Sequence, residues 1–208
     1  GSHLTFSNGQ VFGGNIRYGS TATLNAVGLP HGNAAQGSPL DFAATASQYT
    51  AYSSQFAALA STGGIIYQSW NAIELTGSNA GLNVFNILGS KLSAANTLKI
   101  SAPAGSTVLI NVDGSAVQFQ NAGQLLAGGI DASRILFNFH SASNLTISGI
   151  GVQGSVLAPS AHLAFANGQI NGAGAGASYN GKGEWHQVGV LGDIAAPIPV
   201  PAPAAAVL

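Results

Sequence analysis

Charged side chains are scarce in this chain of 208 residues, and cysteine is absent. Without cysteine, neither a disulfide framework nor a thiolate metal site can form. Aspartate, glutamate, lysine and arginine together make up 5% of the residues, whereas about 25% is usual for a soluble domain. Serine, asparagine, glutamine, threonine and the small residues must therefore cover most of the surface.

The low number of cations argues against two classes of partner. Five lysines and arginines against six acids leave a net charge of −1, so no basic patch is available to displace counterions from phosphates. We therefore expect no nucleic acid and no acidic lipid as partner. No apolar run reaches the roughly 18 residues that a spanning helix needs, so we expect no membrane span in this sequence.

Catalytic patterns are missing as well. The nucleophile-elbow, HExxH and phosphate-loop patterns do not occur, and β-helix lyases and hydrolases would need a cluster of carboxylates. The acids instead stand far apart, and Asp41 suits helix capping while Asp113 suits a turn before Gly114. We expect a protein that is not an enzyme and binds no metal or cofactor.

Short apolar segments separated by glycine and other small residues are abundant, above all from Asn144 to Asn180. Segments of this length predict strands and not helices. Because tight bends join them, we predict a chain that coils around one axis. The expected fold is mainly β, a right-handed parallel β-solenoid (an irregular β-helix), with the hand taken from the preference of parallel crossovers.

One segment changes to a helical period. Ser38 suits an N-cap, Pro39 suits the first helical position, and the Gly63-Gly64 pair ends the pattern. We predict one long α-helix over about Pro39–Thr62, packed alongside the solenoid. The apolar positions at spacings of three and four form an aromatic stripe that should face the sheet, Phe42, Tyr49, Tyr52 and Phe56.

The composition divides the chain into three parts. Residues 1–3, Gly-Ser-His, are typical of an expression-tag remnant. Residues 4–194 are expected to form a single β-solenoid domain with the helix embedded in it. Residues 195–208 alternate proline with small apolar residues, which predicts an extended linker towards an anchor.

Three motifs in a fixed order resemble the bacterial choice-of-anchor A domain family. They are LFNF at 136–139, GSVLAP at 154–159 and NGQING at 167–172, and the resemblance spans roughly residues 4–187. It implies a secreted, surface-attached bacterial protein of a family that includes adhesins. A more distant likeness in architecture, to ice-binding β-solenoid domains, implies binding to ice.

Two sets of residues are candidates for contact with a partner. Exposed aromatic residues beside polar groups can stack on sugars or on a partner protein, which singles out Trp70, Trp185 and His186, although each tryptophan could instead cover a solenoid end. A flat face of small residues would suit ice, and its candidates are Thr21, Thr23, Ser160, His162 and Ala164. Small residues also serve tight stacking in a solenoid.

The leading hypothesis is a secreted, cell-surface-attached, non-catalytic domain that mediates adhesion or contacts with extracellular matrix or biofilm. Its partner would be an extracellular protein or polysaccharide surface. The alternative is an ice-binding protein that uses a flat face of small residues, and an inert spacer is a third possibility.

Overall fold

The computed structural model describes residues 3–12, 14–19, 21–37, 41–186, 188, 192 and 194. The protein is mainly β with two helices, and it divides into two compact units, Gly1–Thr45 and Ala46–Leu208. The predicted linker, residues 195–208, lies outside the described residues, as do the first two residues of the predicted tag remnant.

The first unit contains two pairs of parallel strands. β1 (His3–Gln10) pairs with β3 (Thr21–Gly28), and β2 (Ile16–Tyr18) pairs with β4 (Ala34–Gln36). Parallel pairing requires the chain to return to its starting side after each strand, so even this short segment makes crossovers and no hairpins.

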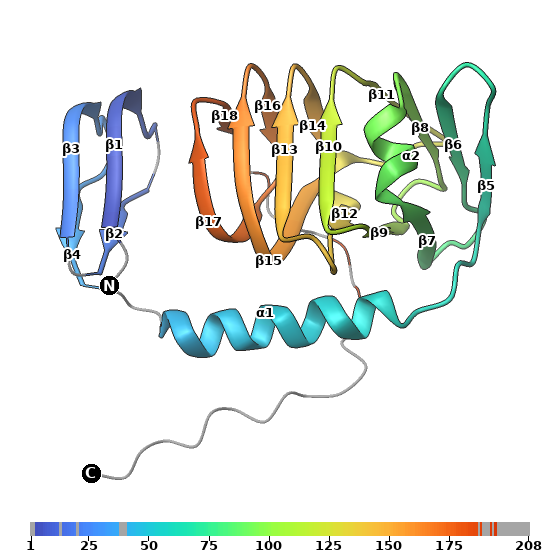
Figure 1. Cartoon of the computed structure of the whole chain (residues 1–208), viewed down its shortest axis with the longest axis horizontal. Coiled ribbons are helices and arrows are strands. Elements are labelled where there is room, and N and C mark those ends of the chain that lie inside the picture. Colours follow the sequence, from blue (N-terminus) through green and yellow to red (C-terminus); the bar gives the residue numbers. More distant parts are fainter. Residues whose placement is uncertain are drawn as a thin grey trace, which may run out of the picture. The chain divides into compact units, whose positions relative to one another are not determined.

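In the second unit, each strand lies beside strands from other parts of the chain, and the paired strands form three rows (Figure 1). The first row consists of β7 (Leu82–Leu88), β9 (Thr107–Asp113), β12 (Ile135–Asn138) and the first part of β15 (Ser155–Ala166). The second consists of β10 (Ala116–Gln120), β13 (Asn144–Ser148), the last part of β15 and the last part of β17 (Gly174–Gly181).

The third row begins with β5 (Gly64–Tyr67), β6 (Ala72–Thr76), β8 (Thr97–Ser101) and β11 (Gly123–Ala127). It ends with β14 (Gly151–Gln153), β16 (Gln169–Asn171) and β18 (Glu184–His186). Side-chain and backbone groups of Gln124 and Gln153 exchange two hydrogen bonds between β11 and β14. All pairs in the three rows are parallel except β5 with β6.

The long strand β15 bends and thereby joins the first two rows into one curled sheet. The register towards β17 shifts between Ala158 and His162, a segment that contains Pro159. Proline donates no backbone hydrogen bond, so it fits a place where the ladder is interrupted. The strands predicted from Asn144 onward are thus confirmed.

The inward residues of all three rows form one apolar core. Buried residues alternate with less buried ones in β13, where Leu145 and Ile147 are fully buried, and in the last part of β15, where Leu163 and Phe165 are at most 2% exposed. Aromatic rings fill the interior, with Phe137 between Phe119 and Phe139 at centroid distances of 5.4 and 6.4 Å.

The long helix is present but shorter than predicted. α1 spans Phe42–Ala57, and Asp41 caps it by accepting hydrogen bonds from the Ala43 and Ala44 amides at 2.9 and 3.0 Å. The predicted cap residues Ser38 and Pro39 lie outside the described residues. In the stripe, Tyr52 and Phe56 pack against the first row, whereas Phe42 and Tyr49 are exposed.

The helix ends early because the residues after it pair with the sheet. Thr62 exchanges hydrogen bonds with Val84 through its backbone amide and its hydroxyl, and the Ser61 hydroxyl accepts from the Asn86 amide. These contacts satisfy backbone groups along the outer edge of β7, which would otherwise be open to strand addition.

A ladder of asparagines fixes α1 across the first row. Asn86, Asn111 and Asn138 lie side by side on β7, β9 and β12. Their amide nitrogens donate to the carbonyl oxygens of Leu59, Phe56 and Ser53, respectively, at 2.7–2.9 Å. Three helical residues rise about 4.5 Å and neighbouring strands lie about 4.8 Å apart, so successive asparagines match carbonyls three residues apart.

A second, short helix, which the sequence patterns did not predict, is α2 (Gly89–Ala94) beside β10. Within the described ranges, neither helix has the length and apolar character needed to cross a membrane.

Candidate functional site

The outward side of the second row is a surface of three aligned columns, whose residues are exposed or half-buried. The strands β10, β13, β15 and β17 lie side by side there, yellow to orange in Figure 1. In β10, β13 and the last part of β15, the outward residues alternate with buried core residues. We call this surface the uncharged face, and it consists of Ala116, Asn144, His162 and Ser178, then Gln118, Thr146, Ala164 and Asn180, then Gln120, Ser148 and Ala166.

The four strands of this face contain no aspartate, glutamate, lysine or arginine. The other two outward surfaces differ from it. α1 covers the first row, and the third row carries the Lys99–Glu74 ion pair at 4.0 Å and the acid Glu184. Amides, hydroxyls and methyl groups are therefore the chemistry that the uncharged face offers.

His162 is the one histidine among the residues of the uncharged face. Its Nδ1 lies 2.7 Å from the Ser178 hydroxyl oxygen, and its backbone amide donates to the Ser143 carbonyl at 2.8 Å. The predicted flat-face residues His162 and Ala164 are both on this face. Ser160 is exposed too, but it lies at the bend of β15, outside the paired register.

The other two predicted flat-face residues belong to the first unit. Thr21 and Thr23 are exposed on β3, where Thr23 stands opposite Thr5 of β1. The structure thus divides the predicted set between two units.

The two tryptophans do not form one site. Trp70 is 61% exposed in the turn between β5 and β6, at one end of the third row, whereas Trp185 lies on β18 at the other end. Trp185 is partly buried and contacts Phe165 and Tyr179 at ring-centroid distances of 5.8 and 6.0 Å. It lines a hollow of about 280 Å³ with Leu163, Tyr179 and small residues of β17.

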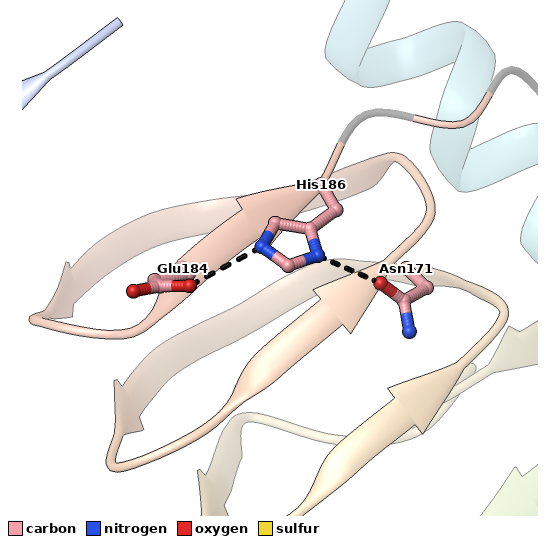
Figure 2. A network of polar contacts seen from close by, with 3 residues as sticks. All are labelled: Asn171, Glu184 and His186. Carbon is pink, nitrogen blue, oxygen red and sulfur yellow. Dashed lines mark hydrogen bonds and ion pairs between the residues drawn. The ribbon is translucent and has the colours of Figure 1, made fainter.

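His186 takes part in a polar network on the third row (Figure 2). Its Nδ1 lies 2.9 Å from Asn171 Oδ1, and its Nε2 lies 3.2 Å from Glu184 Oε2. The Asn171 amide nitrogen in turn donates to Gln153 Oε1 at 3.1 Å. These partners fix His186 on the outward side of the row. The Trp185 ring instead packs inward, so the two predicted contact residues do not form one surface.

Most residues of the uncharged face were not among the sequence candidates. Asn144, Thr146, Ser178 and Asn180 became part of one surface only through the pairing of β13, β15 and β17. Alternation with buried leucine, isoleucine and phenylalanine marks them as outward, but only the register shows that they are adjacent.

Within the part of the chain that the structure describes, no three histidine, aspartate or glutamate side chains gather as a metal site. The residues of the uncharged face can form hydrogen bonds and van der Waals contacts that are distributed over the whole surface. They do not bring acidic and basic side chains together at one point.

A model of the family described as "Putative Ice-binding-like adhesive domain" matches residues 1–187. One solved structure that resembles the chain is the crystal structure of an ice binding protein from an Antarctic Biological Consortium. The two are 12% identical, with a TM-score of 0.36, and the match covers 89% of this chain and 84% of that one. No curated protein matches.

The family match confirms the expected likeness to ice-binding domains at the level of the family, while the choice-of-anchor A assignment stays a prediction. The match covers nearly all described residues, including every strand of the uncharged face. The chain therefore belongs to the family of ice-binding-like adhesive domains.

Proposed function

We propose that the protein attaches to a neutral, hydroxyl-rich extracellular polysaccharide through the uncharged face. The observation that carries this proposal is the absence of aspartate, glutamate, lysine and arginine from four adjacent strands of an adhesive domain. Sugar hydroxyls both donate and accept hydrogen bonds. The amides and hydroxyls of Asn144, Thr146 and Asn180 can do the same.

The low charge of the face lowers the cost of covering it. Burying an unpaired charge against a partner is expensive, whereas a hydrogen-bonded amide or hydroxyl is tolerated. Methyl groups of Ala164 and Ala166 between the polar residues let a flat partner approach closely and add apolar contact. Adhesion would arise from many weak contacts distributed over the columns.

We further propose that the domain is not catalytic. Each acidic residue that the structure describes has a local structural partner. Asp41 caps α1, Glu74 contacts Gln68 and Lys99, and Asp113 accepts a hydrogen bond from Ser141. Asp131 accepts a hydrogen bond from Ser133, and Glu184 contacts His186. The Asp131 pKa is lowered because the Ser133 hydroxyl and backbone amide donate to its carboxylate, which suits a permanent cap and not a general acid.

Three finer features belong to the same proposal. The parallel rows fit a right-handed β-solenoid, because parallel crossovers are nearly always right-handed. The 136–139, 154–159 and 167–172 motifs support the choice-of-anchor A assignment. This assignment implies a secreted bacterial protein that is attached to the cell surface and present in matrix or biofilm.

The substitution Ala164→Arg tests the proposal. Ala164 lies between Thr146 and Asn180 in the middle column, so arginine there adds a long charged side chain at the centre of the face. We expect retention on cellulose and chitin, measured by pull-down at pH 8, to fall at least about tenfold, because the charge would have to be desolvated on contact.

The matched control is Gln169→Arg, which adds the same side chain to β16 of the third row, opposite Glu184. We expect this variant to be retained like the unaltered protein. Equal retention of all three proteins would show that the uncharged face is not the attachment surface. No retention of the unaltered protein on either material would refute attachment to these neutral polysaccharides.

Ice is the second candidate partner, favoured by the small residues Thr146, Ser148, Ala164 and Ala166 that adjoin one another on β13 and β15. Thermal hysteresis and ice-recrystallisation assays on the same proteins distinguish the two partners. Activity of the unaltered protein at micromolar concentration, lost in Ala164→Arg and kept in Gln169→Arg, would assign the face to ice.

A further inference from the structure

We infer that His162 makes attachment through the uncharged face dependent on pH, with stronger attachment when the imidazole is neutral. This inference rests on the proposed function of the face. It concerns a property that neither the family nor the fold implies, namely a single titratable group placed within a surface that otherwise has no charge.

His162 lies in the first column of the face, with a strand of the face on each side of it. It stands in the first column between Asn144 on β13 and Ser178 on β17, and the column continues to Ala116 on β10. The side chain is exposed, and its Nδ1 is held by the Ser178 hydroxyl at 2.7 Å. A partner that covers the columns must therefore cover the other ring nitrogen.

The surroundings of His162 do not compensate a positive charge. The strands packed against β15, namely β12, β13 and β17, contain no charged residue. Tyr179 is the one titratable group in them, and its ring contacts Trp185. His140 lies in the connection between β12 and β13, and Asp113, the last residue of β9, accepts from Ser141. Lys182 directly follows β17.

Protonation changes the face in two ways. Histidine is the side chain that ordinarily gains its charge between pH 8 and pH 5, and the charge would then be desolvated under a neutral partner. In addition, both ring nitrogens become donors. The contact with Ser178 then uses Nδ1–H, and Nε2 can no longer accept a hydrogen bond from a sugar hydroxyl.

The test compares retention on microcrystalline cellulose and chitin beads at pH 8 and pH 5, at fixed ionic strength. We expect the unaltered protein to be retained about tenfold less at pH 5. His162→Gln keeps an uncharged polar side chain and should lose this dependence, so that its retention at pH 5 equals its own retention at pH 8. His162→Lys, charged at both, should be retained weakly at both.

The control is His186→Gln, which removes a histidine from the third row and should leave the pH dependence intact. Circular dichroism at both pH values verifies that all variants are folded. Retention of the unaltered protein that is equal at pH 5 and pH 8, or pH dependence that persists in His162→Gln, would overturn the inference while leaving attachment by the face standing. No retention at either pH would overturn the proposed function and this inference together.

Discussion

Replacing Val156 by aspartate is expected to abolish soluble, folded protein. Val156 is 2% exposed on β15, stands between Phe137 of β12 and Gly174 of β17, and belongs to a core whose members are all apolar. An aspartate there would have no cation or hydrogen-bond donor to compensate its charge. A penalty of more than about 4 kcal/mol is comparable with the whole stability of many domains, about 5–15 kcal/mol.

Soluble yield and cooperative thermal melting measure this effect. Ser160→Asp is the matched control, because it introduces the same side chain four residues later on the same strand, at an exposed position. We expect Ser160→Asp to be soluble and to melt like the unaltered protein. A Val156→Asp protein that melts cooperatively at the same temperature would mean that Val156 does not face the core.

Removing the side-chain amide of Asn138, at the buried end of the asparagine ladder, is expected to cost about 2–4 kcal/mol of unfolding free energy. Asn138 is fully buried; its nitrogen donates to the Ser53 carbonyl and to Asn111 Oδ1, and its oxygen accepts from the Ser53 hydroxyl at 2.6 Å. In Asn138→Ala, the Ser53 hydroxyl and Asn111 Oδ1 would stay buried without these partners. Urea denaturation followed by circular dichroism measures the loss.

Asn86→Ala is the control for this prediction. Asn86 makes the same type of contact just after the end of α1, donating to the Leu59 carbonyl at 2.9 Å, but it is exposed. Water can replace its hydrogen bonds, so we expect a loss below about 1.5 kcal/mol. A loss in Asn138→Ala no larger than in Asn86→Ala would show that the ladder does not fix the helix.

The strands and the core could be predicted from local sequence because their signal is local. Leu145 and Ile147, or Leu163 and Phe165, alternate with small or polar residues, and a strand turns successive side chains to opposite sides. The helix was also visible from its period, but its end was not. Ser61 and Thr62 are compatible with a helical turn, yet their hydrogen bonds with β7 replace helical ones.

The asparagine ladder shows the limit of local patterns. Asn111 and Asn138 are 27 residues apart in the sequence, and each stands in a segment that is otherwise apolar. Nothing in their immediate neighbours indicates that they bind a helix more than 50 residues earlier. Their role depends on the register of β9 with β12 and on the path of α1 across both.

For this protein, the sequence by itself determined which side chains face inward, the nearly charge-free composition of the surface, and the presence of one long helix. Only the tertiary structure decided which outward residues become neighbours and which row α1 covers. His162 and Ser178, 16 residues apart, meet because β15 and β17 pair in one register. Backbone hydrogen bonds between strands are the same for every residue type except proline, so register follows from turn lengths and from packing across the whole core.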